Sequence, residues 1–201
     1  MLCSWSGLPA RGADTIRILA LGDSLTAGYG LRAADGFTAQ LQTTLRQQGF
    51  DVDIVNAGVS GDTTTGGLAR LDWALADNPD AVILELGAND GLRGIDPSLT
   101  RANLGAILAK LKQNERPVLL TGMYAPVNMG PEYVEQFNRI YPELAAEYDV
   151  PLYPFFLDGV ATIAALNQDD GIHPTREGVA VIVGKILPYV TGLIAQIRAS
   201  E

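Results

Sequence analysis

The chain has 201 residues, of which 47% are hydrophobic and 18% are charged, as expected for one globular domain with a sizeable core. Its formal net charge is −9 and it contains only three lysines, which argues against nucleic acid or an anionic membrane surface as a partner, because phosphate binding requires a basic patch. We find no apolar run long enough to cross a membrane and expect no stable membrane insertion, and the single cysteine, Cys3, excludes an internal disulfide and a cysteine-based zinc site.

Residues 1–13 do not read as part of a fold, so we expect a short N-terminal extension followed by one domain over residues 14–201. Small residues at Ala10, Gly12 and Ala13 are what a signal peptidase requires, but a basic start is missing and the apolar stretch is short. Two interpretations stay open. The extension is either the tail of a signal peptide with a displaced start codon, giving a periplasmic or secreted protein, or a disordered extension of a cytoplasmic one.

Apolar, β-branched-rich runs alternate along the chain with segments of helical spacing, such as Phe37, Leu41 and Leu45 at intervals of four. In chain order we predict a strand over 16–21, a helix over 37–48, a strand over 52–56, a helix over 68–76, a strand over 81–86, a helix over 99–111, a strand over 117–123, a helix over 131–148, a strand over 151–156 and a helix over 176–197. Pro188 should break or bend the last helix.

The predicted strands are apolar on both alternating faces, as strands of a parallel sheet covered on both sides must be. Alternation of strand and helix predicts an α/β layered fold with right-handed crossovers, although it does not determine the strand order. Ligands in such folds bind beyond the carboxyl ends of the strands. We therefore expect one functional edge where five polar segments converge, at residues 22–28, 56–65, 87–94, 124–130 and 169–175.

Ser24 lies in the first of these segments, in the string Gly-Asp-Ser-Leu-Thr over residues 22–26. A serine at a strand-to-helix turn can be lifted out of the sheet edge above a helix amide, where it could act as a nucleophile. Taken alone, the string favours a different role, in which Ser24 caps the helix, as serine often does.

His173 is the only histidine in the chain and lies in Asp-Gly-Ile-His-Pro over residues 170–174. A hydrolytic serine needs a base, and histidine is the usual one near neutral pH, so an imidazole base for Ser24 can only be His173. Asp170 could bond to the other ring nitrogen, which is the third role of a catalytic triad. A lone histidine is more often structural, but the nearby carboxylate and the position on the functional edge favour catalysis.

Two other segments could supply an oxyanion hole. Glycines in residues 56–63 permit positive φ or close backbone approach, so an amide there could face an oxyanion, although an ordinary loop is the better interpretation of that segment alone. Asn89 carries an uncharged amide donor suited to an oxyanion, whereas the common alternative for Asn-Asp-Gly is a turn. A metal site explains these residues poorly, because His173 with Asp169 and Asp170 lacks the usual zinc partners and no segment resembles a calcium loop.

Together and in this order, the four blocks resemble those of the SGNH (GDSL) hydrolase family, over nearly everything after residue 13. The matching residues are Ser24 in Gly-Asp-Ser-Leu, Gly61 in Val-Ser-Gly-Asp, Asn89 in Gly-Ala-Asn-Asp, and Asp170 and His173 in Asp-Gly-Ile-His-Pro. The sequence is most similar to the bacterial thioesterase I, lysophospholipase L1 and arylesterase subgroup, for example in Asn-Asp-Gly-Leu-Arg-Gly over residues 89–94.

The resemblance implies an α/β fold of the flavodoxin-like, three-layer α/β/α kind, with a five-stranded parallel sheet of order 2-1-3-4-5. It implies Ser24 as the nucleophile, His173 as its base and Asp170 as the residue that orients His173. The oxyanion hole would use the backbone amides of Ser24 and Gly61 and the side chain of Asn89. No cofactor is implied, and members of the subgroup are often periplasmic, which favours the signal-peptide interpretation of residues 1–13.

The implied substrate is a small acyl ester or thioester. We predict that it contacts Asp23, Gly91, Leu92, Tyr124, Ala125 and Pro126. The apolar loop over residues 124–129 departs from close relatives, and its composition predicts that medium acyl chains are preferred to acetyl. The site should be open, because no long insertion is present to form a lid. Gly58 is the rival to Gly61 for the glycine of the oxyanion hole.

Two other functions stay open. A carbohydrate O-acetylesterase would use the same triad, with a short acyl pocket and sugar-binding aromatic residues. A non-catalytic flavodoxin-like binding module would have no turnover, and the complete set of five catalytic roles argues against it. The sequence makes no prediction of the oligomeric state.

Overall fold

The computed structural model describes residues 15–199, so the extension expected over residues 1–13 lies outside the described residues. Five parallel strands form one sheet with the order β2-β1-β3-β4-β5, which confirms the topology implied by the family resemblance. The strands are β1 (Ile16–Gly22), β2 (Val52–Gly58), β3 (Ala81–Glu85), β4 (Val118–Thr121) and β5 (Leu152–Tyr153).

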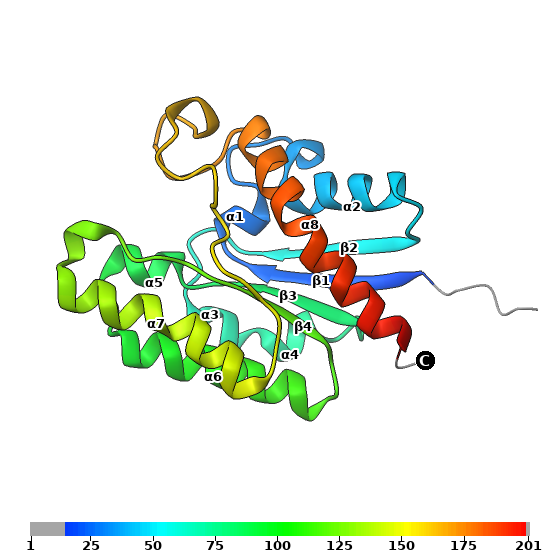
Figure 1. The fold of residues 1–201 in the computed structure, drawn as a ribbon, viewed down its shortest axis with the longest axis horizontal. Helices are drawn as coiled ribbons and strands as arrows, with labels where there is room; N and C mark the ends of the chain where they lie inside the picture. Colours follow the sequence, from blue (N-terminus) through cyan, green and yellow to red (C-terminus); the bar gives the residue numbers. More distant parts are fainter. Residues whose placement is uncertain (1–14, 200–201) are drawn as a thin grey trace, which may run out of the picture.

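Helices cover both faces of this sheet and give the three expected layers (Figure 1). One face carries α1 (Ser24–Ala27), α2 (Phe37–Gln47) and α8 (Arg176–Ala199). The other carries α3 (Thr64–Ala69), α4 (Leu71–Ala74), α5 (Ala88–Arg93), α6 (Pro97–Gln113) and α7 (Pro131–Tyr148). Short 3-10 helices are η1 (Ala33–Asp35), η2 (Val127–Met129) and η3 (Ala164–Leu166).

The ends of three strands meet at one edge of the sheet. In the strand register, Gly22 at the end of β1 lies between Gly58 of β2 and Glu85 of β3. Every residue of β3 and β4 is buried, because helices cover both faces of the sheet. Polar groups that leave the ends of these strands are therefore held on a rigid, close-packed platform.

Two predicted elements differ from the structure. The fifth strand, predicted over 151–156, pairs with β4 only at Leu152 and Tyr153. The next residue, Pro154, has no N–H to continue the ladder, and the chain leaves the sheet there. The helix predicted over 68–76 consists of two short helices, α3 and α4, which meet at Arg70.

We expected Pro188 to break or bend the last helix, and α8 is not broken there but continues from Arg176 to Ala199. Buried residues lie on both sides of Pro188, from Val179 to Ile186 and from Val190 to Ile197, and their packing outweighs the one hydrogen bond that proline removes. Contrary to our sequence analysis, α8 is long and apolar enough to cross a membrane by length and composition alone, since an 18-residue window within it has a mean hydropathy of 1.8. In this fold its apolar face packs against α2 and β4.

Candidate active site

Ser24 is the first residue of α1, directly after the turn that ends β1. The helix is capped by Asp23, whose Oδ1 accepts a hydrogen bond from Leu25 N–H at 3.0 Å, so the capping role considered for Ser24 belongs to its neighbour. The turn requires glycine at position 22, where a Cβ atom would overlap Thr26 and Glu85. The Ser24 side chain is thereby left facing a cavity at the sheet edge.

His173 lies within hydrogen-bond distance of Ser24 and of Asp170. Its Nε2 is 2.9 Å from Ser24 Oγ, and its Nδ1 is 2.6 Å from Asp170 Oδ2. Asp170 Oδ1 also accepts the backbone N–H groups of Ile172 and His173, each at 3.0 Å. The bond from the His173 ring, followed by these two amides, lowers the pKa of Asp170 to about 2. An ionised Asp170 favours the tautomer with hydrogen on Nδ1, which leaves Nε2 free to accept the Ser24 proton.

The loop that carries Asp170 and His173 is closed by backbone bonds. Gln168 N–H donates to the His173 carbonyl at 2.8 Å, and Thr175 N–H donates to the Leu166 carbonyl at 2.9 Å. Gly171 makes the turn between these bonds at a φ of 74°, a conformation that favours glycine. The Thr175 hydroxyl then accepts from Gly178 N–H at the start of α8, so a core helix anchors the loop.

Gly61 and Asn89 face the same cavity as Ser24. Asn89 belongs to helix α5, so the alternative of a simple Asn-Asp-Gly turn is wrong. Its Nδ2 donates one hydrogen bond to Asp23 Oδ2 at 3.1 Å, which leaves one N–H of the side-chain amide for a ligand. Gly61 has a φ of 80°, and its carbonyl accepts from the Arg93 guanidinium at 2.8 Å.

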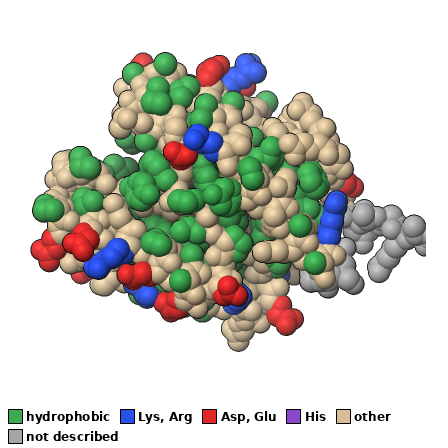
Figure 2. Space-filling model, viewed as in Figure 1, with side chains coloured by type: hydrophobic (Ala, Val, Ile, Leu, Met, Phe, Trp, Pro, Cys, Tyr) green, Lys and Arg blue, Asp and Glu red, His purple; other side chains and the backbone are tan. Residues whose placement is uncertain are grey.

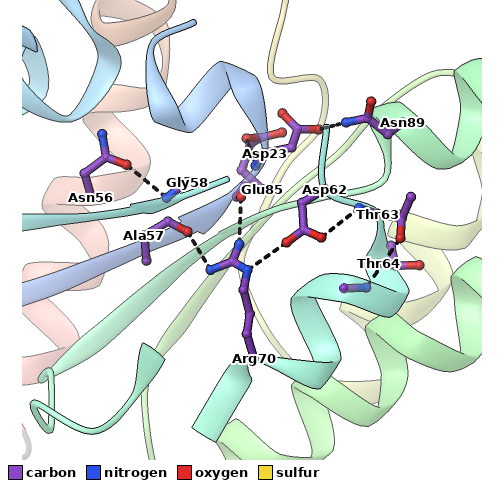
Figure 3. A network of polar contacts seen from close by, with 12 residues as sticks. Asp23, Asn56, Ala57, Gly58, Asp62, Thr63, Thr64, Arg70, Glu85 and Asn89 are labelled. Carbon is purple, nitrogen blue, oxygen red and sulfur yellow. Dashed lines mark hydrogen bonds and ion pairs between the residues drawn. The ribbon is translucent and has the colours of Figure 1, made fainter. Parts of the chain in front are cut away.

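Gly58, the rival glycine, is engaged elsewhere. Its N–H donates to Asn56 Oδ1 at 2.9 Å (Figure 3), and a Cβ atom at this position would overlap the backbone of Ala27. The glycine is therefore explained by the close approach of α1 to the end of β2. This geometry favours Gly61 over Gly58 as the residue whose amide could face a ligand.

A buried glutamate that sequence analysis did not single out bonds to the residues on both sides of Ser24. Glu85 Oε2 accepts from Asp23 N–H at 3.2 Å and from Thr26 Oγ1 at 2.7 Å. Burial, and then the charge of Asp23, raises the pKa of Glu85 well above its usual range. Burial also raises the pKa of Asp23 to about 6. Burial therefore disfavours the charged form of both carboxyl groups.

Arg70 joins the ends of β1 and β2 to the loop that follows β2 (Figure 3). Its guanidinium donates to the carbonyls of Gly22 at 2.9 Å and Ala57 at 2.8 Å, and it forms an ion pair with Asp62 at 2.7 Å. Sequence analysis did not single out this residue, because an arginine in a helical pattern usually faces solvent. Glu85 did leave a signal: it is a charged residue within an apolar run predicted to be a buried strand.

The cavity beside Ser24 has a volume of about 370 Å³, and most of its lining side chains are apolar. Of the predicted substrate contacts, Leu92, Tyr124 and Pro126 line it. Asp23, Gly91 and Ala125 do not line it. Asp23 is fully buried next to Glu85, and Gly91 and Ala125 pack against each other behind the wall, where Ala125 N–H is bonded to Asn138.

One whole side of the cavity was missed by sequence analysis. The segment between β5 and α8 contributes Phe155, Leu157, Ala161 and Thr162 to the wall. The Phe155 ring stacks on Tyr124, with ring centroids 4.6 Å apart, and so links this segment to the loop after β4. Phe155 falls in the strand predicted over 151–156, whereas residues 157–162 show neither helical nor strand periodicity, so the sequence offered no signal for that part of the wall. These residues form one wall of the cavity.

Tyr29, at the end of the α1 turn, was also missed. Its ring packs on the His173 imidazole with centroids 4.5 Å apart, and its carbonyl accepts from the Gln168 side chain at 2.8 Å. The His173 imidazole is therefore held from two sides, by the Asp170 carboxylate and by an aromatic ring. Within residues 15–199, no three His, Cys, Asp or Glu side chains come close enough together to hold a metal ion.

Comparison with known proteins adds to this geometry. Residues 20–181 match the model of a family described as the GDSL-like lipase/acylhydrolase family. The chain is 42% identical to the esterase TesA of Pseudomonas aeruginosa, over 88% of this chain and 89% of that protein. It is 45% identical to the thioesterase 1/protease 1/lysophospholipase L1 of Escherichia coli, over 84% of this chain and 79% of that protein. A crystal structure of TesA superposes with a TM-score of 0.84 at 42% identity, over 88% of this chain and 99% of that one.

Proposed function

Because the chain belongs to the GDSL-like lipase/acylhydrolase family and is a carboxylic ester hydrolase, we propose that it cleaves small acyl esters and thioesters through an acyl-enzyme on Ser24. The observation that carries this proposal is the unbroken chain of contacts from Ser24 Oγ to His173 Nε2 and from His173 Nδ1 to Asp170. Each group stands where a nucleophile, a base and a residue that orients the base are needed.

In the proposed reaction, Ser24 Oγ attacks the carbonyl carbon as His173 Nε2 takes the hydroxyl proton. The carbonyl oxygen becomes an oxyanion, which accepts hydrogen bonds from the backbone amides of Ser24 and Gly61 and from Asn89 Nδ2. His173 then gives its proton to the leaving alkoxide or thiolate. Water then attacks the carbonyl carbon of the acyl-enzyme as His173 takes its proton. His173 returns that proton to Ser24 Oγ, which releases the acid and restores Ser24.

The shape of the cavity supports a medium acyl chain. Its volume of about 370 Å³ and its largely apolar lining suit an alkyl group longer than acetyl. Each buried methylene contributes at most about 0.8 kcal/mol, so a few of them would raise kcat/KM by one or two orders of magnitude until the cavity is filled. A series of p-nitrophenyl esters from acetyl to long chain measures this, and a steady decline from acetyl would favour a carbohydrate O-acetylesterase instead.

A fluorophosphonate probe tests the nucleophile. We expect intact-protein mass spectrometry to show one covalent adduct, with peptide mapping to Ser24, and no adduct on a folded Ser24→Ala protein. An adduct on a different serine would contradict the assignment.

For localisation we propose the periplasm or the exterior of the cell, on the basis of the small residues around Ala10. Recovery of the protein, at full length, in the cytoplasmic fraction would contradict that proposal.

A further inference from the structure

Exposed apolar side chains gather at the mouth of the cavity. Ten large hydrophobic residues are exposed among those that the structure describes, and seven of them either line this cavity or directly adjoin a lining residue in the sequence. Four line the cavity itself, and three directly adjoin lining residues in the sequence. We call these seven residues the rim: Tyr29, Leu92, Tyr124 and Ile172 in the lining, and Val59, Val127 and Ile163 beside it.

The rim comes from separate segments on different sides of the cavity. Val127 lies in η2 after β4 and is 89% exposed, while Ile163 lies between β5 and α8 and is 45% exposed. Figure 2 shows hydrophobic side chains gathered in the hollow between these parts of the surface. Single exposed apolar residues are common on protein surfaces. A cluster of them around one opening indicates a surface that is buried when a partner binds.

We propose that the rim docks on the surface of a neutral or zwitterionic lipid aggregate, a micelle or a bilayer, and that one acyl chain passes from that surface into the cavity. This inference rests on the proposed function, because it supplies the acyl substrate from an aggregated phase. The protein would lie on the surface without any helix inserting into it.

The charges of the molecule select the kind of surface. None of the residues that line the cavity is Lys, Arg, Asp or Glu, and the chain carries a net charge of −9, so an anionic surface would repel it. Arg93, a cation next to the rim residue Leu92, is already bonded to the Gly61 carbonyl. Tyr29 and Tyr124 at the mouth have the amphipathic rings that favour the headgroup level of a lipid surface.

A second copy of the chain fits this surface less well. A partner that buried the rim would also cover the cavity mouth and block the approach of substrate to Ser24. A lipid surface buries the same residues and delivers substrate through the same opening. The rim is therefore better explained as a docking surface for the source of the substrate.

The test measures binding separately from turnover. The Ser24→Ala protein is mixed with phosphatidylcholine vesicles and sedimented, with and without the double substitution Val127→Glu and Ile163→Glu. We expect the double substitution to lower the partition coefficient by roughly tenfold or more, because two apolar side chains are replaced by charged ones. Trp73→Glu is the matched control, since Trp73 in α4 is 77% exposed but lies outside the rim, and this change should have no effect.

Turnover gives the second readout. In the active protein, the rim substitutions should leave hydrolysis of a soluble short-chain ester unchanged and should lower hydrolysis of a long-chain ester only above its critical micelle concentration. The docking proposal is overturned if the Ser24→Ala protein does not bind the vesicles, if Trp73→Glu weakens binding equally, if anionic vesicles bind better, or if Val127→Glu converts a stable dimer into a monomer. Loss of the proposed hydrolytic function would appear separately, as turnover retained by the Ser24→Ala protein.

Discussion

Asn89 lines the cavity and is held by one hydrogen bond, from Nδ2 to Asp23 Oδ2, which leaves its second amide N–H for a ligand. We predict that Asn89→Ala lowers kcat by roughly 10²–10³-fold with little change in KM, because an oxyanion donor acts in the transition state and not on the ground-state ester. Steady-state kinetics on a p-nitrophenyl ester separates the two parameters. A raised KM with unchanged kcat would show that Asn89 only shapes the wall.

Asp170 should stay ionised wherever the protein is assayed, because its pKa is lowered to about 2. A loss of activity on the acid side therefore reports a group other than Asp170, and the mechanism requires His173 to be neutral to accept the Ser24 proton. Activity is present above this transition and disappears as the pH falls through it. His173 is the only imidazole in the chain, so its NMR titration can be followed without ambiguity and should coincide with the acid limb of kcat/KM. A mismatch would show that another group is the base.

At the scale of the elements, the end of β3 contains a carboxyl group, Glu85, whose pKa is raised by burial in the folded protein. In the unfolded chain Glu85 ionises at its ordinary pKa near 4, whereas in the folded protein its pKa is well above the usual range. Unfolding therefore releases a proton over the interval between these two values. The stability contributed by a raised carboxyl pKa is present at low pH and is lost as the pH rises through this interval.

Glu85→Gln removes this dependence and preserves the shape of the neutral group, including an acceptor for Asp23 N–H and Thr26 Oγ1. We predict that the Tm of the variant relative to the original protein increases as the pH is raised from about 5 to 9, the opposite of a carboxylate stabilised by an ion pair. Thermal unfolding across this range measures the difference. A Tm difference that is constant with pH would mean that Glu85 is ionised in the folded state.

The segment between β5 and α8 should set the length of the acyl chain. Ala161 lines the cavity from this segment, so Ala161→Trp should fill part of it and lower kcat/KM for longer esters while leaving acetyl esters nearly unchanged. Ala125, in the predicted wall, is only 6% exposed and faces the core, so Ala125→Trp would test packing instead. Equal losses for all chain lengths in Ala161→Trp would show that the chain lies elsewhere.

For the molecule as a whole, the sequence predicted most of the fold because each strand is continuously apolar and each long helix has a regular apolar stripe. The strand order came from the family resemblance and not from these patterns. Ser24, Asp170 and His173 could be selected because one histidine limits the pairings to a single choice. The structure brings these three side chains into contact, and their catalytic roles stay predictions.

The rest of the site depends on contacts between residues far apart in the sequence. Arg70 and Glu85 act through bonds to strand ends that only the packed sheet brings together. Phe155 lies just after Pro154, where the chain has left the predicted strand and its ring stacks on Tyr124, and Ala161 lies in a segment that has no periodic signature. Sequence patterns report local periodicity, so they do not predict which residues of an irregular segment line a cavity.

The central claim is that Ser24 is the nucleophile of an ester hydrolase, and the turnover of purified Ser24→Ala protein tests it most directly. The change removes one hydroxyl at a cavity wall, so circular dichroism and Tm should stay close to those of the original protein. We predict that kcat for a p-nitrophenyl ester falls by about 10⁶, the loss measured when the nucleophile of a well-studied serine protease is removed. A folded Ser24→Ala protein that keeps its turnover would contradict the account.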